Sequence, residues 1–116
     1  MDETLESELR ELHERVCKAI ADPKRLLIIS VLRDGELSVG ELAETLGVSQ
    51  SNASQHLAVL RERNIVTTRR AGTSVFYSLR SPKILMAIDL MREFIAEEAS
   101  LTLEPPDRKV ASIFLS

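Results

Sequence analysis

The spacing of apolar residues between positions 38 and 60 predicts two short helices joined by a tight turn. Ser38 and Glu41 form an S-x-x-E pattern, in which each side chain binds a backbone N–H group at the start of a helix. Gly47 follows a short apolar stripe and is expected to end that helix, because glycine adopts the left-handed cap conformation without steric cost. Ser49 is then placed to cap a second helix. These signals predict a helix-turn-helix.

The second helix, from about Gln50 to Arg63, has one apolar side and one side of short polar residues. A solvated helix usually carries Lys and Glu, whereas this face carries hydroxyl, amide and imidazole groups, which can bind base edges and phosphates. An ordinary helical pair with an uncharged polar face is the alternative interpretation. For His56 the sequence leaves two interpretations open: a DNA contact, or packing beneath the turn. The residues predicted to contact DNA from this helix are Gln50, Ser51, Asn52, Ser54, Gln55 and His56.

A β-hairpin is predicted over residues 65–79, directly after the polar helix. Two runs of β-branched and aromatic residues flank the segment from Arg69 to Thr73, in which Gly72 marks the turn. A helix-turn-helix followed by a hairpin is a winged helix, and the wing can reach phosphates beside the groove that the helix occupies. Arg69, Arg70 and Thr73 are therefore predicted DNA contacts, although two arginines could also simply solvate the edge of a hairpin.

Two further amphipathic helices are predicted over residues 3–20 and 82–99. A winged-helix core of this size cannot bury both completely, so they predict a homodimer surface that presents two polar helices to one face of a duplex. The alternative is that both helices wrap around their own domain. Residues 1–99 are expected to form one dimeric, mainly α domain with a small β-hairpin, and residues 100–116 a tail. The apolar residues predicted for the dimer surface are Leu5, Leu9, Leu12, Val16, Leu85, Ile88, Met91 and Ile95.

The charge of the chain is unevenly distributed. The net charge is −3, yet residues 49–80 hold five arginines and a single acidic residue. A locally basic segment suits a site that faces phosphate and argues against loose coating of nucleic acid. No apolar run approaches the roughly 20 residues of a membrane helix, so no membrane partner is expected. Cys17 is the only cysteine, which precludes an intramolecular disulfide and favours a cytoplasmic location.

Three segments occur in a specific order: ADPKRLLIISVL (21–32), GELSVGELAETLGVSQSNASQHLAVLRERNIV (35–66) and RRAGTSVFYSL (69–79). Together they resemble the ArsR/SmtB family of small winged-helix repressors, over roughly residues 10–98. The resemblance implies a homodimer that binds an imperfect inverted repeat near a promoter and releases it when an inducer is sensed. It also implies that the polar helix is the recognition helix and that Arg69 to Thr73 form the wing tip.

Many members of this family sense metals, so the positions of their ligands must be compared. One family site uses two cysteines in an E-L-C-V-C motif, where this chain has Ser38 and Gly40. A hydroxyl is a poor ligand for soft metals, and glycine offers no ligand. A second family site pairs Asp and His on the last helix. Asp89 fits the acidic place, but no histidine follows His56.

His13 and Cys17 are the only remaining candidates for metal ligands, and they are weak ones. They lie four residues apart on one predicted helix and therefore share a face. Solvent exposure of His13 and apolar packing of Cys17 are the simpler interpretations. We therefore expect no metal and no other cofactor. The inducer is left open among an unidentified small ligand between the dimer helices, oxidation of Cys17, and no inducer.

Three classes of function compete: a sequence-specific repressor, a winged helix that contacts only proteins, and an enzyme. A module for protein contacts would gain nothing from a polar helix face beside two arginines. The sequence contains no Ser/His/Asp set, glycine-rich phosphate loop or cluster of metal ligands, so an enzyme is not expected. The sequence predicts a homodimeric repressor that binds double-stranded DNA, with the protein-interaction module as the alternative.

Overall fold

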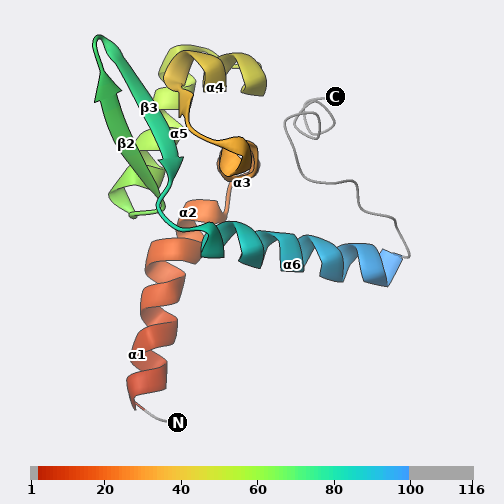
Figure 1. Ribbon diagram of the computed structural model, residues 1–116. Coiled ribbons are helices and arrows are strands. Elements are labelled where there is room, and N and C mark those ends of the chain that lie inside the picture. Colours follow the sequence, from red (N-terminus) through yellow and green to blue (C-terminus); the bar gives the residue numbers. More distant parts are fainter. Residues whose placement is uncertain (1–2, 100–116) are drawn as a thin grey trace.

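Residues 3–99 are described by the computed structural model, and they form a small helical body with a three-stranded sheet (Figure 1). The predicted tail, residues 100–116, lies outside the described residues. Within residues 3–99, none of the helices is long and apolar enough to cross a membrane. The elements in chain order are α1 (Glu3–Glu11), η1 (Leu12–Cys17), α2 (Lys18–Ile20), α3 (Pro23–Val31), η2 (Leu32–Asp34), β1 (Leu37–Ser38), α4 (Val39–Leu46), α5 (Gln50–Glu62), β2 (Val66–Ala71), β3 (Ser74–Leu79) and α6 (Pro82–Ala99).

The helix predicted over residues 3–20 is one helical run with an irregular middle. The segment η1 is a π-helix, which holds more residues per turn than the α-helical segments before and after it. The predicted apolar stripe is present, but its two ends differ. Leu5, Leu9 and Leu12 are exposed, whereas Val16 and Ile20 are half-buried and lie next to the fully buried Ala19. Only the last part of this run is therefore packed against the body.

Asp22 and Pro23 begin α3 as their residue types predict. The Asp22 carboxylate accepts hydrogen bonds from the backbone N–H groups of Lys24 and Arg25, and Pro23 occupies the first turn. Burial alone would raise the pKa of Asp22, but these two bonds, together with the nearby charges of His56 and Arg25, hold the pKa below the usual value. The short 3₁₀ segment η2 extends α3 to Gly35, whose φ of 129° lies in a region that other residues rarely adopt.

The helix-turn-helix is formed by α4 and α5, with the caps that the sequence predicts. Ser38 and Glu41 form both bonds of the capping box at the start of α4. Gly47 ends α4 in the left-handed conformation, with φ of 69° and ψ of 35°. The Ser49 side chain accepts from the Asn52 N–H and caps α5. Because these caps depend on neighbouring residues only, the local sequence was enough to predict them.

The predicted hairpin is part of a three-stranded antiparallel sheet with the order β1-β3-β2. The additional strand, β1, has two residues, and Leu37 and Ser38 pair with Tyr77 and Phe76 of β3. The turn between β2 and β3 contains only Gly72 and Thr73, because strand β2 continues through Ala71. The prediction that Arg69 and Arg70 lie between the strands is therefore wrong: both arginines lie within β2, paired with Phe76 and Val75.

The core lies between α3, α4, α5 and the inner face of the sheet. Its largest fully buried side chains are Ile28, Ile29, Val31, Leu42, Leu46, Leu57 and Leu60. One side of α6 also packs on this core, because Leu85 and Ile88 are only 8% and 5% exposed. This burial revises the prediction that Leu85 and Ile88 face a partner chain, since their side chains are already covered within the same chain. The predicted winged helix-turn-helix fold is confirmed.

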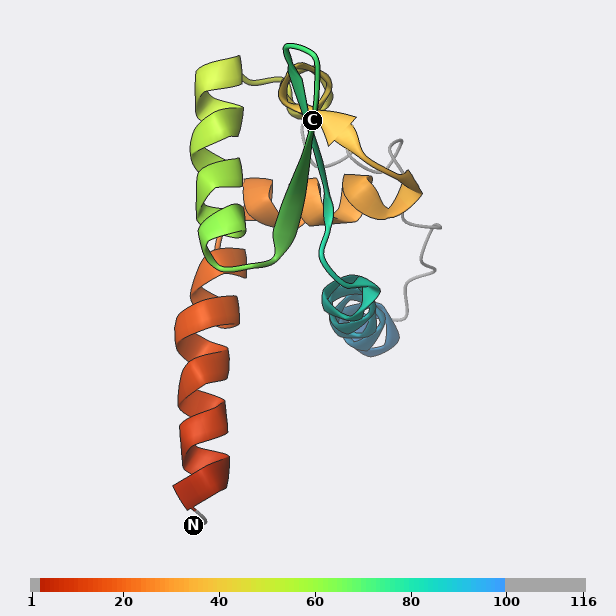
Figure 2. The ribbon, with the colours of Figure 1, turned by 60° about the vertical axis from the view of Figure 1, so that its left-hand side comes forward.

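Large exposed apolar side chains gather on α1, the start of η1 and the outer side of α6. In Figure 1 the α1 helix projects downward from the body and α6 projects to the right; in Figure 2 α1 again points downward and α6 is seen nearly end-on. We call this set the apolar outer face; its members are 45–65% exposed. They are Leu5, Leu9, Leu12, Met86, Leu90, Met91, Phe94 and Ile95.

Candidate nucleic-acid interface

The outer side of α5 is polar and carries little charge. Ala53, Leu57 and Leu60 turn inward and are fully buried, which fixes the rotation of the helix about its axis. The opposite side is solvent-exposed and presents hydroxyl and amide groups near the N-terminal end. These exposed residues are Gln50, Ser51, Ser54 and Gln55. The predicted contact face is thus available to a partner at these four positions.

Asn52 and His56 lie at the edge of this face and are half-buried. The Asn52 Oδ1 atom is buried and accepts no hydrogen bond within the described residues. His56 lies against α3, where its Nδ1 is 3.4 Å from the Arg25 Nη1, and the Arg25 guanidinium also binds the carbonyl of Ala19. His56 is thus partly covered by α3, and its predicted DNA contact stays a prediction. These two residues are less well placed for base contacts than their neighbours.

Arg61 belongs to the exposed side of α5, although no sequence pattern had selected it as a contact. It follows Ser54 by seven residues, which is close to two helical turns, so both lie on nearly the same side. No hydrogen bond or ion pair involves the Arg61 side chain within the described part of the chain. The seven-residue spacing was the signal that could have identified it as a phosphate contact.

The two arginines of the wing point to opposite faces of the sheet, because successive residues of a strand alternate. Val66 is buried in the core, so its face, which includes Arg70, is the inner face toward α5. Arg69 lies on the outer face, where its guanidinium binds the Glu36 carboxylate and stacks over the Phe76 ring at 4.9 Å from the centroid. The side chain of Arg70 makes no hydrogen bond or ion pair within the described residues. Arg70 is therefore better placed than Arg69 for a contact beside α5.

The N-terminus of α5 and the turn of the wing lie at the same end of the molecule. Both are at the top of Figure 1 and of Figure 2, whereas α1 points to the opposite end. Thr73 is exposed in that turn. One surface can therefore contact the polar residues of α5 and the wing tip together, as binding to a groove and its neighbouring phosphates requires.

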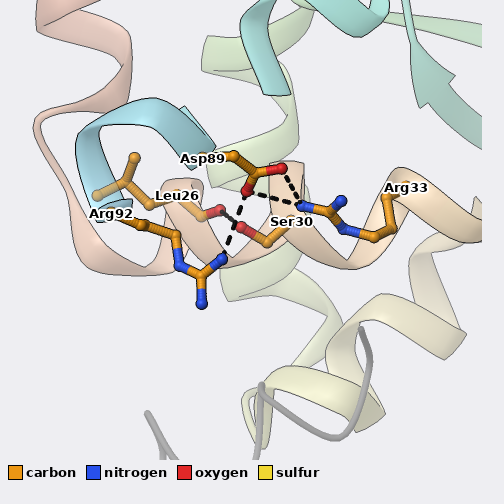
Figure 3. Close-up of polar contacts among 5 residues, drawn as sticks. All are labelled: Leu26, Ser30, Arg33, Asp89 and Arg92. Carbon is orange, nitrogen blue, oxygen red and sulfur yellow. Dashed lines mark hydrogen bonds and ion pairs between the residues drawn. The ribbon is translucent and has the colours of Figure 1, made fainter. Parts of the chain in front are cut away.

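The positions of the family's metal ligands are occupied by structural contacts. The Ser38 hydroxyl caps α4, and Gly40 has no side chain to offer. Asp89 accepts two hydrogen bonds of 2.9 Å from the Arg33 Nη2, and the Arg92 Nη1 lies 3.4 Å away (Figure 3). A carboxylate that is bound by two guanidinium groups is not free to coordinate a cation.

The weak pair of candidate ligands, His13 and Cys17, lies on the surface. The His13 side chain is 65% exposed, with its Nδ1 3.8 Å from Glu14, and Cys17 is exposed. No group of three His, Cys, Asp or Glu residues within positions 3–99 is arranged to hold a metal ion. Cys17 is not the small buried residue that apolar packing would need.

The family model of the bacterial regulatory proteins of the arsR family matches residues 22–68, which run from the cap of α3 into β2. The nodulation protein NolR of Rhizobium meliloti is 40% identical over 88 residues, which are 76% of this chain and 72% of NolR. The transcriptional activator HlyU of Vibrio cholerae is 45% identical over 80 residues, 69% of this chain and 74% of HlyU. The chain belongs to the ArsR family.

Solved structures agree with this ArsR assignment. Reduced HlyU superposes with a TM-score of 0.71 at 40% identity, covering 80% of this chain and 97% of HlyU. The homodimeric winged helix-turn-helix DNA-binding domain Mb0332 of Mycobacterium bovis gives a TM-score of 0.72 at 28% identity. The superposition covers 84% of this chain and 89% of the Mb0332 domain. These ArsR relatives are regulators of transcription rather than enzymes, and the structural likeness extends beyond the segment that the family model matches.

Proposed function

We propose that this ArsR-family chain is a homodimeric repressor that binds an inverted-repeat operator in double-stranded DNA. The observation that carries the proposal is the exposed polar face at the N-terminal end of α5, which lies at the same end of the molecule as the turn of the wing. Side-chain amides and hydroxyls read base edges in the major groove, and an arginine beside them binds phosphate. The contacts proposed for bases are Gln50, Ser51, Ser54 and Gln55; those proposed for phosphates are Arg61, Arg70 and Thr73.

The proposed dimer uses the apolar outer face. All eight large apolar side chains that are exposed within residues 3–99 belong to α1, η1 and α6, which is the pattern of an interface. The relative Mb0332, which shares this fold, is homodimeric. We include Val16, which is half-buried beside this face, and propose that residues 1–99 form one domain with its own dimer helices. A regulator of transcription works where the DNA lies, so we also propose a cytoplasmic location.

No metal takes part in this proposal, because the capping bond of Ser38 and the ion pairs of Asp89 occupy the family's ligand positions. The three alternatives for the inducer are an unidentified small ligand between the dimer helices, oxidation of Cys17, and no inducer. The alternative module for protein contacts is less well supported, because its surface would be expected to be apolar, whereas the end of the molecule with α5 and the wing is polar. The direction of regulation also needs a test, since HlyU is named an activator.

Selection of bound duplexes from a random pool tests the proposed function. We expect the full chain to enrich an inverted repeat with half-site centres about 34 Å apart, which is one turn of DNA. A reporter gene placed behind that sequence should lose expression when the chain is present. Enrichment of no sequence would contradict the proposed function and leave the protein-interaction module, whereas increased reporter expression would identify an activator.

Gln55 and Arg70 are expected to contribute in different ways. The Gln55→Ala chain should lose roughly 1–3 kcal/mol of discrimination at one base position, because a base contact is removed. The Arg70→Gln chain should weaken binding to all sequences alike and reduce the slope of log K against log salt by about one unit, because a phosphate contact is removed. Binding isotherms over a salt series, on the operator and on operators with single base changes, measure both effects.

The two measurements can contradict this division of roles. If Arg70→Gln changed the choice of sequence and left the salt slope as it was, Arg70 would contact a base. Asn52→Ala and His56→Ala serve as comparisons, because both side chains are half-buried at the edge of α5. Their effect on base discrimination should be smaller than that of Gln55→Ala.

A further inference from the structure

Arg69 crosses the outer face of the sheet and ends at Glu36, which precedes β1. In the register of the sheet, Arg69 pairs with Phe76, and Phe76 pairs with Ser38 of β1. These three residues therefore lie in one row across all three strands. The Arg69 Nε donates to both Glu36 carboxylate oxygens at 3.1 Å, and Nη2 donates to Oε1. The side chain thus spans the sheet from its β2 edge to the segment before β1.

The contacts of Arg69 restrict its orientation. Its guanidinium makes a forked interaction with one carboxylate and stacks over an aromatic ring, and both kinds of contact depend on the plane of the group. The hydrogen bond with Arg69 lowers the pKa of Glu36, and the same bond raises the pKa of Arg69. The pair is therefore fully ionised at neutral pH. An arginine held in this way is not available to a phosphate unless the pair opens.

The segment that holds Glu36 is itself anchored to the body. It lies between η2, which continues α3, and Leu37, which is buried at 4% exposure. The wing, by contrast, extends beyond the core, since residues 69–74 are all exposed. A link between Glu36 and Arg69 therefore ties the exposed part of β2 to the first buried part of the sheet.

We propose that Glu36 is a positioning residue for DNA binding. Its carboxylate holds the Arg69 guanidinium over the Phe76 ring, and we call these three side chains the brace. The brace fixes the angle at which the wing presents Arg70. Arg69 then acts through this brace and not as a phosphate contact. The proposal rests on the proposed function, because its main readout is operator binding. It also reassigns Arg69, which the sequence pattern had grouped with Arg70.

Substitutions that remove the charge of Glu36 or of Arg69 test the proposal. Glu36→Gln removes a negative charge, so a purely electrostatic effect would tighten binding to DNA. The brace predicts the opposite: affinity for the selected operator falls about two- to fivefold, the range for loss of an exposed ion pair, and the salt slope does not change. Arg69→Gln should give the same loss with the same slope, whereas Arg70→Gln should reduce the slope by about one unit.

The charge-exchanged chain, Glu36→Arg with Arg69→Glu, provides the matched control. It restores an ion pair between the two positions but not the stacking of position 69 over Phe76, so operator affinity should recover part of the loss seen in Arg69→Gln. Tighter binding by Glu36→Gln, or a slope reduced by Arg69→Gln, would overturn the proposal. So would a charge-exchanged chain that binds no better than Arg69→Gln.

Hydrogen exchange of the wing amides separates this proposal from the proposed function. Without DNA, the amides of residues 70–75 should exchange faster in Glu36→Gln and in Arg69→Gln than in wild type. In the charge-exchanged chain they should exchange more slowly than in Arg69→Gln. If the wild-type chain selects no operator but the exchange rates follow this order, the brace exists and the proposed function is wrong. Unchanged exchange in both single variants would refute the brace itself.

Discussion

A chain with Leu90→Glu and Phe94→Glu is expected to sediment as a monomer and to lose operator affinity by about 100-fold or more. The two side chains are each 65% exposed and lie one turn apart on the outer side of α6. Two carboxylates in an apolar contact, repeated in the partner by symmetry, would be buried without counter-ions, which costs several kcal/mol. A monomer also binds only one half-site and loses the gain from joining two sites.

The matched control for this variant is Leu90→Met with Phe94→Leu, which keeps the surface apolar and should remain a dimer. Circular dichroism of both variants should match wild type, because neither side chain belongs to the core of the single chain. Sedimentation over a concentration series gives the dissociation constant. A wild-type chain that is monomeric at micromolar concentration would contradict the proposed dimer.

The elements with local signals were predictable from sequence. The capping box of Ser38 and Glu41, the left-handed Gly47 and the cap at Ser49 each involve residues within a few positions of one another. Such bonds depend on local residue types, so the helix-turn-helix and its boundaries could be predicted without the rest of the fold. The polar residues on α5 were also identifiable, because the apolar positions of that helix leave only one side outward.

Features that depend on distant residues could not be predicted. Strand β1 has two residues and no periodicity of its own, so it becomes a strand only by pairing with β3. The partner of Arg69 is 33 positions away, and no spacing rule indicates such a distance. Apolar residues occur around much of α6, and the sequence alone did not indicate that Leu85 and Ile88 turn inward while Leu90 and Phe94 turn outward.

Sequence patterns likewise could not predict the ion pairs of Asp89, and these ion pairs change the role assigned to that residue. The sequence offered Asp89 as the one acidic position of a family metal site. In the structure it connects α6 to η2 through Arg33, which is 56 positions away, and to Arg92 on its own helix. The three side chains are between 21% and 28% exposed, so water screens them only in part (Figure 3). The residue is better described as a link between the outer helix and the body.

Asp89→Ala is expected to lower the free energy of unfolding by about 2–3 kcal/mol, because two partly buried guanidinium groups lose their counter-ion. The Arg33 Nε is already buried without a hydrogen-bond partner within the described residues, so this cation has little left to bind once the carboxylate is gone. Urea denaturation at fixed chain concentration measures the change. Glu93→Ala, on the same helix but exposed, is the matched control and should change stability by less than about 0.5 kcal/mol.

A second substitution separates the ion pair from the rest of the helix contact. If the loss in Asp89→Ala comes from the unpaired cation, then Arg33→Met in the same chain should recover part of it, because the buried charge is removed together with its partner. The double variant is thus expected to be more stable than Asp89→Ala alone. A double variant that is less stable than either single variant would mean that Arg33 and Asp89 stabilise the chain through independent contacts. The link between α6 and η2 would then depend on the apolar packing of Leu85 and Ile88 alone.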